Sequence, residues 1–82
     1  MSTRLPKVEY LADINILEAE WSEEPIAHTD GRELWRIADY DAAGNIVYIE
    51  WVNASQGVDL RGLPQEIEEL VRSGGHGFPV LV

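Results

Sequence analysis

The chain has 82 residues and no cysteine, which is enough for one small domain over residues 1–82 with a modest core and no disulfides. Fifteen acidic residues against six basic ones give a formal net charge of −9, which argues against binding to nucleic acid or to anionic membranes. No run approaches the roughly 20 apolar residues that span a bilayer, and residues 1–7 lack the apolar core of a signal peptide, so we expect a cytoplasmic protein.

The first part of the chain predicts two short strands. Residues 7–10 form the first, which places Val8 and Tyr10 on its inner side. Residues 16–22 form the second, in which apolar and acidic side chains alternate: Leu17, Ala19 and Trp21 face inward, and Glu18 and Glu20 face outward. A helix over residues 13–24 is the alternative, because leucine, alanine and glutamate are good helix formers. The alternation favours the strand.

The middle of the chain predicts three more strands. The third, residues 26–29, ends at a turn at Asp30-Gly31. Residues 34–55 predict a hairpin whose turn, residues 41–45, contains a glycine and an asparagine that tolerate positive φ; two unrelated strands are the alternative. We expect a five-stranded antiparallel meander in which sequential neighbours pair. Its apolar face would carry Leu17, Ala19, Trp21, Ile37, Val47, Ile49 and Trp51.

The last part of the chain predicts a helix and an apolar tail. Residues 63–73 combine a proline in the first turn with an apolar stripe, and Gly74-Gly75 would end the helix. Packed on the apolar face of the sheet, this helix completes an α+β domain. The tail, residues 76–82, is too apolar to lie free in solvent. It would be buried either on its own sheet or on a second chain, and the sequence favours neither.

The hairpin region also carries a motif that continues upstream. Its parts are Asp39-Tyr40-Asp41, Gly44-Asn45-Ile46-Val47, Ile49-Glu50 and Asn53-Ala54-Ser55, preceded by Tyr10, Asp13, Asn15, Leu17, Trp21-Ser22 and Pro25-Ile26-Ala27. Over about residues 8–55 this pattern resembles the YuzE-like family of small bacterial proteins of unknown function. Tyr48, Leu11 and Glu18 depart from it, since the family usually has glycine, aspartate and an aromatic residue there. The resemblance implies a small antiparallel sheet and no defined activity.

The chain shows little that would support catalysis, and we do not expect an enzyme, a cofactor or a metal site. It has no cysteine nucleophile, no glycine-rich phosphate loop before a helix and no serine elbow. Its two histidines, His28 and His76, share no metal-ligand spacing. One alternative is a small ligand-binding or catalytic domain in which Asp39, Asp41 and His28 line a pocket.

The acidity predicts a basic protein as partner, because opposite charges steer association. We therefore expect a non-enzymatic protein-binding module, antitoxin-like or inhibitor-like. Genes of the YuzE-like family often lie beside genes for small toxin-like proteins, so the resemblance also implies a partner of this kind. The contact residues that we predict are Glu18, Glu20, Glu23, Glu24, Trp35 and Arg36. A self-associating accessory domain, such as a homodimer, is a further alternative, and so is acidity that serves only solubility.

Overall fold

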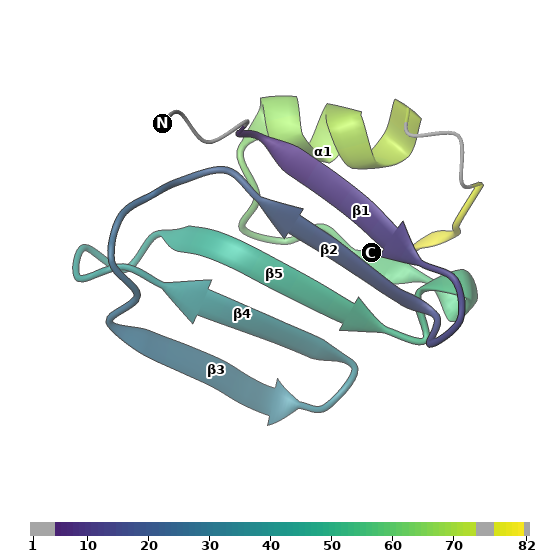
Figure 1. Cartoon of the computed structure of the whole chain (residues 1–82), viewed down its shortest axis with the longest axis horizontal. Helices are drawn as coiled ribbons and strands as arrows, with labels where there is room; N and C mark the ends of the chain where they lie inside the picture. The colour runs from purple at the N-terminus through teal and green to yellow at the C-terminus, as the bar shows by residue number, and fades with distance from the viewer. Residues whose placement is uncertain (1–4, 74–76, 82) are drawn as a thin grey trace.

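The chain forms a sheet of five antiparallel strands with a helix near the C-terminus, which confirms the predicted α+β class (Figure 1). The computed structural model describes residues 5–73 and 77–81. The elements in chain order are β1 (Lys7–Leu11), β2 (Ile16–Glu20), β3 (His28–Glu33), β4 (Arg36–Tyr40), β5 (Ile46–Val52), the 3-10 helix η1 (Ala54–Gln56), β6 (Val58–Asp59), α1 (Gln65–Ser73) and β7 (Val80–Leu81). In this described part of the chain, every helix is too short or too polar to cross a membrane.

The strand order is β1-β2-β5-β4-β3. Sequential neighbours pair as predicted at β1–β2, β3–β4 and β4–β5, but β2 pairs with β5 and not with β3. The segment of residues 21–27 carries the chain from β2 to the far edge of the sheet (Figure 1). The result is a Greek-key arrangement in the reverse chain direction. Burial explains this order: β5 is the most apolar strand and gains most from a central position, whereas β3 is polar and suits an edge.

The predicted hairpin is present, with β4 and β5 joined by a turn over residues 41–45. The Asp41 carboxylate holds this turn by accepting hydrogen bonds from the amides of Ala43 and Asn45. The register places Ala38 opposite Ile49. Ala38 therefore faces the core, and Ile37, opposite Glu50, faces the other side of the sheet. The prediction that Ile37 belongs to the apolar face was wrong, because the pairing register and not the alternation within β4 selects the inward side.

The third strand begins later and runs further than predicted. It continues through Asp30-Gly31 to Glu33, with an irregularity in its pairing between Asp30 and Glu33, and the reversal comes at Leu34-Trp35. Asp30 does not start a turn between strands. Its carboxylate instead accepts hydrogen bonds from the backbone amide and the guanidinium of Arg32.

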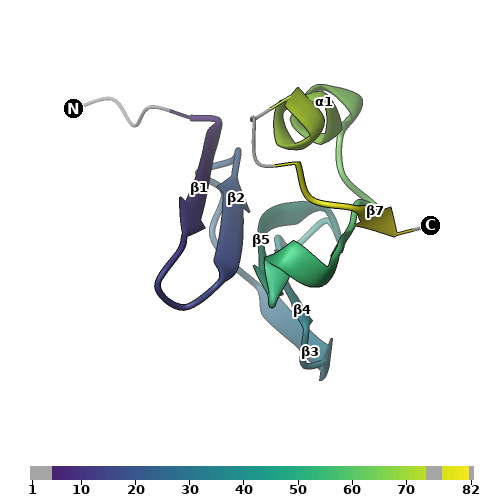
Figure 2. The same ribbon diagram turned by 90° about the vertical axis from the view of Figure 1, so that its right-hand side faces the viewer.

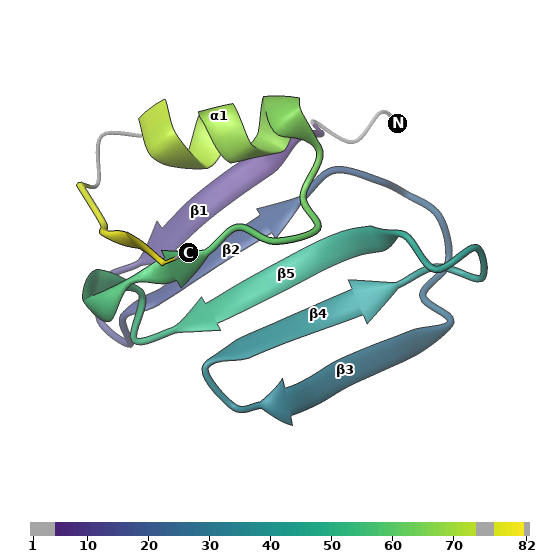
Figure 3. The ribbon, with the colours of Figure 1, turned by 180° about the vertical axis from the view of Figure 1, so that it is seen from behind.

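The core lies between the sheet and the C-terminal segment. Leu17, Ala19, Ile49 and Trp51 point from β2 and β5 into this core, as predicted, and all four side chains are fully buried. Trp21 is only partly buried and packs at the edge of this cluster. On the other side, the core is closed by Val58, Leu60, Ile67 and Val71. Figures 2 and 3 show that α1 lies over the β1–β2 part of the sheet and leaves β3 and β4 without a helix above them.

The apolar tail docks on its own chain, although Leu81 stays 41% exposed. Phe78 and Val80 pack against the core, and β7 pairs with β6 in parallel, with the Val58 amide donating to the Pro79 carbonyl at 2.8 Å. This outcome was one of the two alternatives for the tail, although it uses β6 and not an edge of the main sheet. The predicted helix stop at Gly74-Gly75, and His76, lie outside the described residues.

Candidate protein-binding surface

One face of the five-stranded sheet is not covered by any element of the described chain. Figure 2 shows that α1 and β7 both lie on the opposite side. The side chains on the uncovered face alternate with those of the core, and we call this surface the open face. Its members are Lys7, Glu9, Leu11, Ile16, Glu18, Glu20, Thr29, Ile37, Asp39, Tyr48, Glu50 and Val52.

A row of glutamates crosses the middle of the open face. Glu9 lies opposite Glu18 in the β1–β2 pair, and Glu18 lies opposite Glu50 in the β2–β5 pair. Like charges that face each other directly across strands destabilise a sheet. Lys7 offsets part of this repulsion, since its ammonium lies 3.3 Å from the Glu9 carboxylate. The glutamate row therefore lowers the stability of the folded sheet, so stability alone does not explain why these carboxylates lie together.

An apolar row borders the glutamates. Leu11 pairs with Ile16, and Ile16 pairs with Val52, so three half-buried aliphatic side chains lie side by side. Trp35 is next to them in the backbone, because its carbonyl accepts a hydrogen bond from the Val52 amide at 2.8 Å. The open face thus combines carboxylates with apolar area that a partner could cover.

At the other end of the open face lies a hollow of about 270 Å³, which we call the acidic hollow. Its lining residues are Glu20, Ser22, Glu23, Glu24, Ile26, Asp39, Val47 and Tyr48. Three of the four predicted contact glutamates are among them: Glu20 from β2, and Glu23 and Glu24 from the connection to β3. The Ser22 hydroxyl accepts a hydrogen bond from the Glu24 amide and so orders that connection.

The fourth predicted glutamate, Glu18, is held beside the hollow by Tyr48. The Tyr48 hydroxyl donates to the Glu18 carboxylate at 2.8 Å. Burial raises the pKa of Tyr48, and the hydrogen bond to Glu18 and the nearby charge of Glu50 raise it further. Tyr48 therefore stays a protonated donor, and Glu18 keeps a fixed position on the open face.

Arg36, one of the predicted contact residues, lies on the covered side of the sheet. It is opposite Trp51 in the pairing register. Its Nε donates to the Asp59 carbonyl at 3.1 Å, and its Nη2 donates to the Arg61 carbonyl. The structure therefore places Glu18 on the open face and Arg36 on the covered side, while Trp35 lies in the turn before β4 with its backbone next to Val52.

The three residues of the alternative catalytic site do not line one pocket. His28 stacks on Tyr40, with ring centroids 4.8 Å apart, in a pair that shares the side of Ala38 and not that of Asp39. Asp39 lies on the open face and accepts a hydrogen bond from the Thr29 hydroxyl at 2.6 Å. Asp41 is occupied in the hairpin turn. Among residues 5–73 and 77–81, no three histidine, aspartate or glutamate side chains gather in a way that could hold a metal ion.

Comparison with protein-family models, curated proteins and solved structures finds no match. The resemblance to the YuzE-like family stays a prediction.

Several members of this surface were not among the predicted contact residues. Glu50, Tyr48 and Asp39 point the same way as Glu18, because each pairs across the sheet with a residue of the open face. The alternation in the hairpin strands carried this signal, since Tyr48 and Glu50 alternate with the buried Ile49 and Trp51. Val47, which was predicted for the apolar face, is buried but lines the acidic hollow, next to an irregularity in the β4–β5 pairing. The alternation could not predict which strand lies next to β5. That strand is β2, and it brings Glu18 beside Glu50.

Proposed function

We propose that this chain is a non-enzymatic protein-binding module that holds a basic protein on the open face, in the manner of an antitoxin or an inhibitor. The observation that carries the proposal is the acidic hollow next to a row of glutamates on a sheet face without a helix. Five carboxylates and one lysine lie on that face, within a chain of net charge −9. Such a field steers a positively charged protein toward the surface.

The acidic hollow suits a lysine or arginine side chain of the partner. Glu20 and Asp39 offer carboxylates for the cationic group, and the ring of Tyr48 offers a face on which its methylene groups can pack. Ile26, which is 55% exposed, supplies an apolar wall. A cation in the hollow would become partly desolvated, which strengthens its attraction to the carboxylates.

The glutamate row gives the partner a second set of contacts. A cationic side chain placed between Glu18 and Glu50 would replace a repulsion within the sheet by two attractions. Burial of the neighbouring apolar row would add the hydrophobic contribution that charge pairs alone do not supply. The arrangement thus favours one basic partner that spans the hollow, the row and the apolar edge.

Self-association is the weaker use of this face. A second copy docked face to face would bring two glutamate rows together, and this repulsion would oppose the contact. We therefore expect light scattering to show a monomer when the partner is absent.

A paired-variant binding experiment tests the proposal. The tagged chain is used at low salt to capture proteins from an extract of its native host, and a basic protein that elutes with salt is purified. Its affinity is then measured for the parent chain, for Glu20→Gln with Glu24→Gln, and for Glu66→Gln with Glu69→Gln on α1. Both pairs remove the same charge, but only the first lies at the hollow.

We expect the pair at the hollow to weaken binding at least about tenfold, which corresponds to ~1.4 kcal/mol, and the helix pair to change it little. Equal affinities for the two double variants would show that only net charge matters, and the proposed site would be wrong. A chain that retains no basic protein at low salt would contradict the proposed function altogether.

A further inference from the structure

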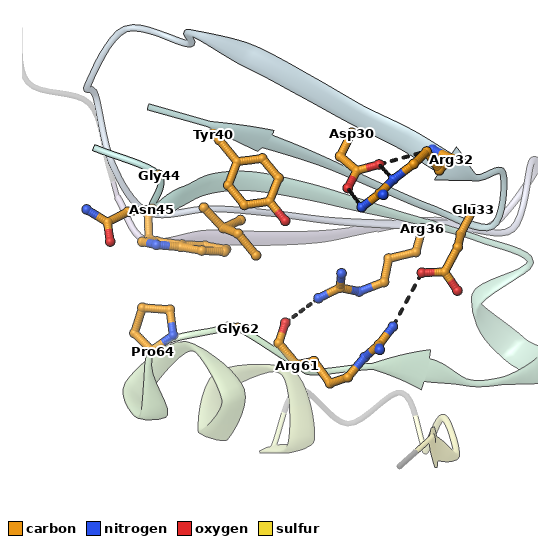
Figure 4. Close-up of a pocket in the computed structure, with 12 residues that line it drawn as sticks. Asp30, Arg32, Glu33, Arg36, Tyr40, Gly44, Asn45, Arg61, Gly62 and Pro64 are labelled. Carbon is orange, nitrogen blue, oxygen red and sulfur yellow. Dashed lines mark hydrogen bonds and ion pairs between the residues drawn. The ribbon is translucent and has the colours of Figure 1, made fainter. Parts of the chain in front are cut away.

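A second concave site lies on the other side of the sheet, between β3–β4 and the segment that precedes α1 (Figure 4). It is a groove of about 520 Å³, a size typical of sites for small molecules. Three of the six basic residues of the chain line it, namely Arg32, Arg36 and Arg61. We call it the arginine groove. Half of the basic side chains of this acidic protein thus lie at one cavity, which is an unusual distribution.

Two of these arginines are neutralised by carboxylates. The guanidinium of Arg32 lies 2.8 Å from the Asp30 carboxylate, and the hydrogen bond to Arg32 lowers the pKa of Asp30 to about 2. Arg61 binds the buried Asp59 at 2.6 Å and Glu33 at 3.3 Å. Arg32 is therefore matched by one carboxylate, and Arg61 by two.

Arg36 differs from them because, within the described residues, no carboxylate lies within 4.0 Å of its guanidinium. It is instead anchored by the backbone carbonyls of Asp59 and Arg61. A guanidinium has five N–H donors, and these two bonds use one at Nε and one at Nη2. Figure 4 shows the remaining part of the group directed into the space beneath Tyr40. Among the described residues, Arg36 is thus a fixed, half-buried cation at the groove with no carboxylate in direct contact.

We expect a ligand that completes this site to carry an anionic group, because the carbonyls on Arg36 leave its charge unmatched by a carboxylate in direct contact among the described residues, and a guanidinium matches carboxylate and phosphate geometry. It also needs a flat apolar part. The rings of Tyr40 and Trp21 line the groove with Ile46 and Pro64, and aromatic side chains stack well on planar groups. Gly44 and Gly62 also line the groove, where they leave the backbone uncovered by a side chain.

We propose that the arginine groove binds a small aromatic anion, with its carboxylate or phosphate on Arg36 and its ring against Tyr40 and Trp21. This site is separate from the acidic hollow and takes a ligand of opposite charge. Its occupation does not depend on the proposed binding of a basic protein on the open face.

The first test is an NMR titration of the ¹⁵N-labelled chain with benzoate, phenyl phosphate, inorganic phosphate and neutral benzamide. We expect saturable shifts at the amides of Gly44, Asn45 and Gly62 with the two aromatic anions, and at least tenfold weaker binding of benzamide. Preference for benzoate or for phenyl phosphate tells which anionic group the groove takes. Equal binding of benzamide, or no saturable shift at millimolar concentrations, would overturn the proposal. If inorganic phosphate binds as tightly as phenyl phosphate, the proposed contact of an aromatic ring with Tyr40 and Trp21 would be wrong.

The second test uses charge variants. Arg36→Gln should weaken binding of the preferred anion at least tenfold, whereas Arg72→Gln, the same charge change on α1 outside the groove, should leave it unchanged. Because Arg36 also anchors two carbonyls, its loss could disturb the fold. Asn45→Asp avoids this, since it adds a negative charge at an exposed lining residue. It should weaken the anion about tenfold relative to Gln56→Glu, a matched control outside the groove. Unchanged affinity in Asn45→Asp would contradict the site.

Discussion

Glu18 of β2 lies directly opposite Glu50 of β5 on the face of the sheet that no helix covers. Two like charges in this position should cost stability. We therefore expect Glu50→Gln to raise the free energy of unfolding by about 0.2–1 kcal/mol while it weakens binding of a basic partner. Urea denaturation measures the first effect. Glu69→Gln on α1 is the control, because it removes the same charge from an exposed helix position. A Glu50→Gln chain no more stable than the Glu69→Gln chain would show that the row carries no strain.

The raised pKa of Tyr48 should make the folded chain less stable as the pH rises above about 10. Its pKa is raised in the folded state from an ordinary value of 10.0, so the folded state binds this proton more tightly than the unfolded state does. The contribution is complete below about pH 10 and is lost as pH rises above it. We expect thermal unfolding to shift to lower temperature between about pH 10 and 12, and less so in Tyr48→Phe. An absorbance titration that, by comparison with Tyr48→Phe, shows Tyr48 ionising near its ordinary value of 10.0 in the folded chain would contradict this.

Trp51 is the largest fully buried side chain, and its indole Nε1 donates to the Asp59 carbonyl at 2.9 Å. Trp51→Ala should cost about 3–5 kcal/mol, a large part of the roughly 5–15 kcal/mol that holds a small domain folded. Leu34→Ala, at a side chain that is 81% exposed, should change stability by less than about 0.5 kcal/mol. Denaturation followed by circular dichroism compares the two. A Trp51→Ala chain that melts with its parent would refute the assignment of this core.

Gly57 connects the 3-10 helix to the strand on which the tail docks. Its φ of 140° is unfavourable for other residues, and an added Cβ would come within 2.7 Å of Leu81. Gly57→Ala should therefore destabilise the chain by about 1–3 kcal/mol and expose the Val58 amide to hydrogen exchange. Gly31→Ala is the control, because its Cβ would meet no atom within 4 Å. Slow exchange of Val58 in the Gly57→Ala chain would show that the tail docks without this close approach.

Much of the local structure could be predicted from the sequence. The alternation of Leu17 and Ala19 with Glu18 and Glu20 correctly predicted a strand where composition alone suggested a helix. The hairpin turn followed from its aspartate and glycine, and the helix followed from its apolar stripe, of which Ile67 is buried. These features depend on neighbours two to four residues away, so the chain specifies them without knowledge of the whole fold.

Long-range features were decided by the tertiary structure. The sequence predicted acidic contact residues, but the pairing of β2 with β5 decided that Glu18 faces Glu50 and that Glu20 meets Asp39 at the hollow. The hairpin register turned Arg36 to the covered side, where the carbonyls of Asp59 and Arg61, distant in sequence, anchor it. The physical reason is competition between strands: the most apolar strand takes the centre of the sheet and selects its neighbours by total burial, which no local pattern records.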